Sequence, residues 1–176
     1  MFQRQSKKTA MLAGGAIIIV AVLGVLVIAS RVRGETYIRI VDAQSTPTDA
    51  TPSPGADLKA VEVHKTKNDR RYFASAVVSS DIKSGGEENE NNFTDPQVLL
   101  AKAEENGAMD FVSLGGGEVV VRINALLQSG DELIIHEVGA ANSASADYFD
   151  VYTSTSDNGP WILRGTGTGL TTLTIE

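Results

Sequence analysis

A run of twenty residues without a charge, at positions 10–29, constrains this chain more than any other feature of its sequence. Arg4, Lys7 and Lys8 precede the run, and two further arginines follow it closely. An α-helix rises about 1.5 Å per residue, so this run is long enough to cross a bilayer core of about 30 Å. The sequence therefore predicts a transmembrane helix at 10–30 that acts as a signal anchor, with residues 1–9 as a cytoplasmic tail.

A short basic tail stays in the cytoplasm more easily than the long remainder of the chain, which sets the expected orientation. A cleaved signal peptide is the alternative, with Val27, Ile28 and Ala29 before the cleavage point, although the apolar core of such peptides is usually only roughly 7–15 residues long. Both alternatives place residues 34–176 outside the cytoplasm. We therefore expect a single-pass protein of the cytoplasmic membrane whose C-terminal domain is extracellular or periplasmic.

The charge of the chain is unevenly distributed. Residues 1–33 contain five of the 15 Lys and Arg residues and none of the 22 Asp and Glu residues, so residues 34–176 carry 10 positive and 22 negative charges, a net charge of −12. An acidic domain repels phosphate backbones, which argues against binding to nucleic acid. The chain has no cysteine, so burial and hydrogen bonds must hold the domain together without disulfides.

Short strands separated by turn residues dominate residues 34–176. The alternation of apolar and polar residues, and the enrichment in β-branched and aromatic residues, predict strands. A Pro/Thr/Ser-rich loop is expected at 43–56 and an acidic loop at 84–92, with glycine turns at 115–117 and 156–159 and one helix at 96–106. Little helix and many strands indicate an all-β fold, an antiparallel jelly-roll β-sandwich. The strands are expected at 34–42, 57–64, 72–79, 111–114, 118–124, 132–138, 147–154, 161–164 and 171–175.

Three motifs together resemble a known family. They are FVSLGGGEVVV at 111–121, GDELIIHEVG at 130–139, and FDVYTS at 149–154 followed by Trp161. This succession is similar to the galactose-binding-like (discoidin-like) jelly-roll β-sandwiches of bacterial cell-surface proteins. The resemblance implies the same sandwich fold and a role in binding at a cell surface.

The order of the segments differs from that of the family. Domains of this kind usually end with a strand like YIRIVD and then one like DLKAVEV, but here those segments come first, at 37–42 and 57–63. Circular permutation is one explanation, in which residues 36–63 complete their own sandwich, and compact domains tolerate it because their termini often lie close together. The other is that these strands complete a neighbouring subunit by strand exchange, forming an oligomer.

The resemblance also implies a calcium site. Galactose-binding-like sandwiches often hold a structural calcium between an early loop and a carboxylate near the end of the domain. The corresponding residues here are Asp95, in the loop at 92–95, and Glu62, whereas Lys59 stands where the family often has an acid. Oxygen ligands of this kind suit calcium, and no other cofactor is expected.

The residues give no sign of an active site. The two histidines, His64 and His136, lie in strand patterns without a nucleophile motif or a second zinc ligand, and we expect them at the surface or at a sheet edge. Among the aromatic residues, Trp161 is expected to pack across the sandwich. The chain is therefore expected to be no enzyme but a binding or adhesion module for carbohydrate or a surface partner, with calcium as its expected stabilising ion. The alternative is a structural subunit of a surface assembly joined by strand exchange.

Overall fold

The computed structural model describes residues 34–42, 55–83, 93–107, 110–138 and 147–176. Residues 34–176 form one compact unit. In these described ranges no helix is long and apolar enough to span a membrane. The tail predicted at 1–9, the anchor predicted at 10–30, residues 43–54 and the acidic loop at 84–92 lie outside the described residues.

The regular secondary structure of the described residues is almost entirely strand, with one short helical segment, which confirms the predicted all-β fold class. Each of the nine segments predicted to be extended contains a strand, and the boundaries differ by a few residues at most. The strands are β1 (Thr36–Asp42), β2 (Asp57–Lys65), β3 (Arg70–Asp81), β4 (Val112–Ser113), β5 (Glu118–Ile123), β6 (Glu132–Glu137), β7 (Phe149–Ser154), β8 (Ile162–Gly167) and β9 (Thr171–Thr174).

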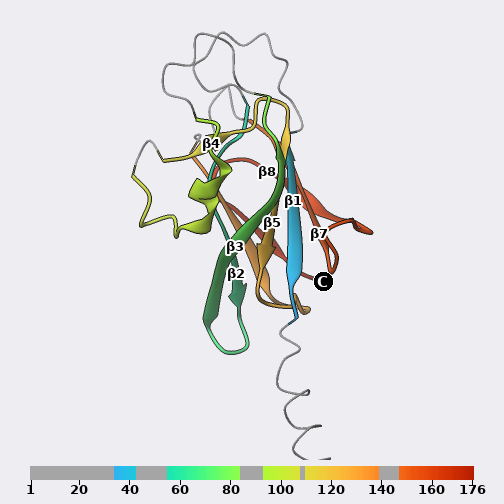
Figure 1. Ribbon diagram of the computed structural model, residues 1–176. Coiled ribbons are helices and arrows are strands. Elements are labelled where there is room, and N and C mark those ends of the chain that lie inside the picture. Colours follow the sequence, from blue (N-terminus) through green and yellow to red (C-terminus); the bar gives the residue numbers. More distant parts are fainter. Residues whose placement is uncertain (1–33, 43–54, 84–92, 108–109, 139–146) are drawn as a thin grey trace, which may run out of the picture. The chain divides into compact units, whose positions relative to one another are not determined.

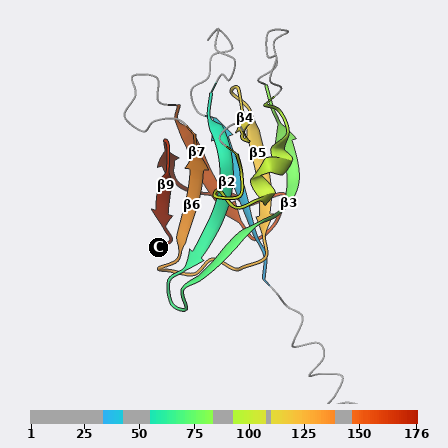
Figure 2. The same ribbon diagram turned by 90° about the vertical axis from the view of Figure 1, so that its left-hand side faces the viewer.

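The strands form one antiparallel sheet that folds over on itself into a nearly barrel-shaped sandwich (Figure 1). The strand order is β8-β7-β1-β5-β3-β2-β6-β9, with β4 paired to the start of β2. The long strand β3 connects the two layers, because residues 70–73 pair with β2 and residues 74–81 pair with β5. We call β8-β7-β1-β5-β3 the five-stranded layer and β2-β6-β9 the three-stranded layer, which Figure 2 shows from its own side.

The two strands that come first in the sequence lie inside the strand order of the sheet, not at its ends. β1 pairs with β5 on one side and with β7 on the other (Figure 1), and β2 pairs with β6 and with β3. Ile40 of β1, for example, lies opposite Val119 and Val151 of the same chain. One chain therefore supplies both neighbours of each of these strands.

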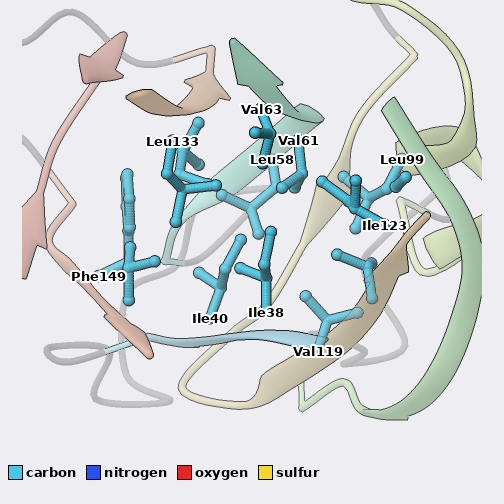
Figure 3. Close-up of a cluster of buried hydrophobic side chains, with 14 of the residues drawn as sticks. Ile38, Ile40, Leu58, Val61, Val63, Leu99, Val119, Ile123, Leu133 and Phe149 are labelled. Carbon is cyan, nitrogen blue, oxygen red and sulfur yellow. The ribbon is translucent and has the colours of Figure 1, made fainter. Parts of the chain in front are cut away.

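The core fills the space between the two layers. Successive side chains of a strand point to opposite faces of the sheet. Every second residue of β1, β5 and β7 therefore points into this space and packs against every second residue of β2 and β6. Leu99 enters the core from the segment beside β2 and β3, and it is fully buried. Figure 3 shows this core, which includes Ile38, Ile40, Leu58, Val61, Val63, Val119, Ile123, Leu133 and Phe149.

The prediction of a helix at 96–106 is wrong beyond the first turn. Only a short 3-10 helix, η1 (Pro96–Leu100), forms, and Ala101 already has extended backbone angles (φ −89°, ψ 164°). The side-chain amide of Asn106 donates hydrogen bonds to the carbonyls of Lys59 (2.8 Å) and Val98 (3.1 Å). These contacts hold the segment against β2, so tertiary structure overrides the helical propensity of its sequence.

The prediction that Trp161 packs across the sandwich is also wrong. Trp161 precedes β8, is partly exposed and is not part of the buried core. Its indole packs against the hairpin turn, since a Cβ atom added to Gly159 would lie only 2.9 Å from Trp161 Cδ1. The inward positions of this hairpin belong to Phe149 and Val151, which are both fully buried.

Candidate functional site

The outward side of the five-stranded layer carries a dense set of aromatic, charged and apolar side chains. In β1 the fully buried residues Ile38 and Ile40 alternate with the partly exposed residues Tyr37, Arg39 and Val41. Side chains directly opposite one another on neighbouring strands share a face of the sheet, so the strand register identifies the neighbours of these three residues. We call the resulting set the outer face; it consists of Tyr37, Arg39, Val41, Glu118, Val120, Arg122, Asp150, Tyr152, Ser154, Leu163 and Thr166.

Arg39 is at the centre of the outer face. It lies opposite Val120 on β5 and opposite Tyr152 on β7, and Tyr152 in turn lies opposite Leu163 on β8. The guanidinium carbon of Arg39 is 5.9 Å from the centroid of the Tyr152 ring, which is within cation–π range. Leu163 is 55% exposed. This middle row therefore offers an apolar side chain, an aromatic ring and a cation on three adjacent strands.

A row of acidic residues lies on one side of the middle row. Val41 is opposite Glu118 on β5 and opposite Asp150 on β7. Arg39 Nε donates a hydrogen bond to Glu118 Oε2 over 3.0 Å, and Thr166 Oγ1 donates one to Asp150 Oδ1 over 2.5 Å. Both carboxylates are thereby fixed in place and still carry further acceptor sites.

Hydrogen-bond donors lie on the other side of the middle row. Tyr37 lies opposite Arg122 on β5, and its hydroxyl donates to Glu35 Oε2 over 3.2 Å. Partial burial and this hydrogen bond both raise the pKa of Tyr37, so the phenol stays protonated. Arg122 Nη1 is 3.7 Å from Glu35 Oε1, and Arg122 Nε is buried without a hydrogen-bond partner. The Arg122 guanidinium thus has fewer partners than its donors can serve.

The two residues predicted to bind calcium are in different elements and have other partners. Asp95 is exposed and caps η1, where its Oδ1 accepts a hydrogen bond from the backbone N–H of Gln97 over 2.9 Å. Glu62 on β2 is 4% exposed, and its Oε1 accepts a hydrogen bond from Arg71 Nη1 over 2.5 Å. His136 Nε2 lies 3.4 Å from the same oxygen. Over the ranges that the structure describes, no group of three or more His, Asp or Glu residues could hold a metal ion, and calcium stays a prediction.

The other histidine connects three parts of the three-stranded layer. His64 Nδ1 is 2.9 Å from Glu132 Oε2 on β6, and His64 Nε2 is 2.8 Å from Asp69 Oδ1 in the turn between β2 and β3. The hydrogen bond to Glu132 and the one to Asp69 raise the pKa of His64. Of the two expected positions, surface or sheet edge, the structure excludes the edge, because β2 and β6 both have neighbours on each side. Both histidines are partly exposed at the surface.

The outer face was missed when the sequence was considered alone. The alternation at 37–41 indicated that Tyr37, Arg39 and Val41 share one side of a strand, and the alternation at 148–152 grouped Asp150 with Tyr152. Periodicity says nothing about which strands are neighbours, so the two groups could not be joined. The register between β1 and β7 supplies that information.

The chain was compared with protein-family models, with curated proteins and with solved structures, and none of the three comparisons found a match.

Proposed function

We propose that this chain is a membrane-anchored binding or adhesion module whose β-sandwich holds a carbohydrate or a surface partner outside the cytoplasm. The outer face is its binding surface, and the apolar run at 10–29 is its anchor. The observation that carries the proposal is the row of Leu163, Tyr152 and Arg39 on three adjacent strands. Tyrosine and arginine are the residue types that contribute most to recognition at protein surfaces.

The backbone beneath the outer face supports a role in binding. Each inward neighbour on β1, β5 and β7, such as Ile40, Val121 and Val151, is fully buried in the core. Binding sites built on sheet strands are held more precisely than sites on loops, because packing fixes the backbone on which the side chains stand. A ligand on the outer face would therefore meet side chains that are already ordered by their neighbours.

We further propose that the sandwich is a circularly permuted jelly roll of the galactose-binding-like class. The motif resemblance at 111–121, 130–139 and 149–154 supports this assignment. The positions of β1 and β2 support it too, since strands that would end such a domain lie inside the strand order of the sheet of their own chain. Pairing within one chain favours permutation over strand exchange between subunits.

Retention on cell envelopes tests the proposed function. The full chain in detergent is incubated with sedimented envelopes of the organism that makes it, and the bound fraction is measured for the wild type, Arg39→Ala and Arg70→Ala. Arg70 is an exposed arginine at the start of β3, outside the outer face, and is the matched control. We expect Arg39→Ala to lose most of the binding and Arg70→Ala to retain it. Equal binding by all three proteins would refute the outer face as the binding surface.

A further inference from the structure

We infer that the partner of the outer face is the outer face of a second copy of this chain, so that the domain joins two membranes by homophilic adhesion. This inference rests on the proposed function and names its surface partner. It follows from the placement of opposite charges about the middle row, from the direction of the strands and from the size of the face.

The outer face carries opposite charges at equal distances from its middle row. On β5, Glu118 stands two residues before Val120 and Arg122 stands two residues after it, and Val120 itself belongs to the middle row. Residues two positions apart in a strand share a face of the sheet. Asp150 on β7 lies on the same side of the row as Glu118, so this side is acidic and the side of Arg122 is not.

A twofold axis along the middle row makes this face complementary to itself. When two copies meet face to face about such an axis, each group meets the group at the mirrored place across the row in the second copy. Glu118 of each copy then meets Arg122 of the other, which gives two equivalent ion pairs. An axis along β1 would instead place Glu118 against Asp150 of the second copy, where like charges repel.

Both members of these pairs have capacity for a further partner. The side chains of Glu118 and Arg122 are 32% and 37% exposed. Glu118 accepts a hydrogen bond from Arg39, but a carboxylate has lone pairs for additional donors. Arg122 Nη1 is 3.7 Å from Glu35 Oε1, which is too long for a hydrogen bond. The Arg122 guanidinium therefore has donors left for a carboxylate of the second copy.

The middle row supplies apolar surface at the centre of the contact. Leu163 is 55% exposed, and Tyr152 lies opposite it on the neighbouring strand. The axis runs along this row, so both side chains pack against the same row of the second copy and lose contact with water. Arg39 bonds to Glu118 on the acidic side of the row, which carries the two Arg39 guanidiniums to opposite sides of the axis.

The direction of the strands suits two facing membranes. An axis across the strands makes the strands of the two copies antiparallel, so the two β1 strands begin at opposite ends of the pair. The predicted anchor precedes β1 in the sequence. The two chains therefore enter the pair from opposite ends, as copies anchored in two opposed membranes do.

A single contact of this kind is weak. Four strands about 4.8 Å apart, with about five residues along each, cover about 300–400 Å² per copy, whereas a stable interface buries about 800 Å² per partner. Each domain also has a net charge of −12, a repulsion that salt screens beyond about 8 Å. The domain is therefore monomeric in dilute solution, and adhesion arises when two membranes that hold many copies form many contacts at once.

Clustering of lipid vesicles tests the inference. The full chain is reconstituted into two vesicle populations with donor and acceptor dyes, and clustering is measured as energy transfer between them. The variants are Glu118→Arg, Arg122→Glu and the chain that carries both changes, with Arg70→Ala as the control. We expect clustering by the wild type and Arg70→Ala, and about tenfold or more weaker clustering by each single reversal, which places like charges opposite each other.

Mixed populations give the sharpest result. Glu118→Arg on one population and Arg122→Glu on the other restore opposite charges at both ion pairs, so we expect the mixture to cluster although neither variant clusters with itself. The chain with both reversals should cluster with itself for the same reason, and a misfolded variant could not show such recovery. Wild-type vesicles that do not cluster, or a mixture that clusters no better than its components, would overturn the inference.

The outcomes separate this inference from the proposed function. If envelope retention depends on Arg39 but the vesicles do not cluster, the partner is a different molecule of the envelope; the inference then fails while the proposed function stands. If envelope retention is independent of Arg39 and the vesicles do not cluster, both fail.

Discussion

Arg71 donates a hydrogen bond of 2.5 Å to Glu62, a residue that is only 4% exposed although it lies on the outward side of β2. The guanidinium on β3 thus neutralises a nearly buried negative charge on the neighbouring strand. A calcium ion at Glu62 would have to compete with this internal cation, and the exposed carboxylate of Asp95 already caps η1. The pair of Arg71 and Glu62 therefore bears on both stability and metal binding.

Removal of the Arg71 guanidinium should destabilise the domain. In Arg71→Gln the carboxylate of Glu62 remains buried without its counter-ion, and we expect a loss of about 1–2 kcal/mol, moderated by the 52% exposure of the Arg71 side chain. Chemical unfolding of residues 34–176 measures this change. The double variant with Glu62→Gln should recover most of the loss, since no uncompensated charge remains. If the double variant loses as much free energy of unfolding as the two single variants together, the two side chains act independently.

Calcium should have little effect on the wild type and more on Arg71→Gln. A ligand that binds only the folded state raises the melting temperature, but in the wild type Arg71 already occupies the Glu62 carboxylate. Melting of both proteins in excess calcium and in excess chelator measures this difference. A clear calcium-dependent rise in the wild-type melting temperature would show that Arg71 does not exclude the ion.

The domain should lose stability as the pH rises through the pKa of His64 in the folded state. A neutral imidazole has one N–H, so only the protonated ring can donate to both Glu132 and Asp69. These two partners raise the pKa of His64, although burial of the ring and the charge of Arg71 both act to lower it. The stabilisation is therefore complete below the unfolded value of about 6.5 and disappears above the folded value.

Thermal melting of the wild type and His64→Gln at several pH values measures this effect. We expect the difference in melting temperature between the two proteins to be larger at about pH 5.5 than at about pH 8.5. A difference that stays constant across this range would mean that protonation of His64 does not contribute to stability.

Leu99 should contribute to stability far more than its position in a short 3-10 helix suggests. It is fully buried in the core between the layers, beside β2 and β3. Leu99→Ala should cost about 3 kcal/mol, because it removes the buried side chain and leaves a cavity. Leu170, which is 66% exposed, is the matched control, and Leu170→Ala should cost less than about 0.5 kcal/mol. Equal losses in urea unfolding would show that Leu99 does not fill the core.

The sequence predicted the local structure well wherever the hydrophobic period was unambiguous. The segment 34–42 alternates cleanly and is strand from Thr36 to Asp42, and the glycines at 115 and 116 do adopt positive φ angles of 58° and 84° in the expected turn. The segment 96–106 contains good helix formers, yet its short helix already ends at Leu100. The reason is that the Asn106 side chain donates hydrogen bonds to the carbonyls of Lys59 and Val98. Contacts made by residues distant in sequence decided that case.

The candidate site depends even more on such distant pairings. Arg39 and Tyr152 are more than a hundred positions apart in the sequence, and only the pairing of β1 with β7 makes them neighbours. The order of the segments left two explanations open, completion of the same sandwich by residues 36–63 or strand exchange with another subunit, because a strand pattern contains no information on its partners. Glu62 was predicted as a calcium ligand, and the structure shows that its carboxylate accepts a hydrogen bond from Arg71, a pairing that the sequence did not indicate.

An engineered disulfide tests most directly whether one chain assembles the outer face. The chain has no cysteine, so Val41→Cys and Asp150→Cys together introduce a single possible pair, at positions that lie opposite each other on β1 and β7. Directly opposite residues of antiparallel strands are close enough for a disulfide. After oxidation of residues 34–176, non-reducing electrophoresis and light scattering should show a cross-link within a monomer. Disulfide-linked dimers would contradict the account, because β1 would then complete the sandwich of another subunit.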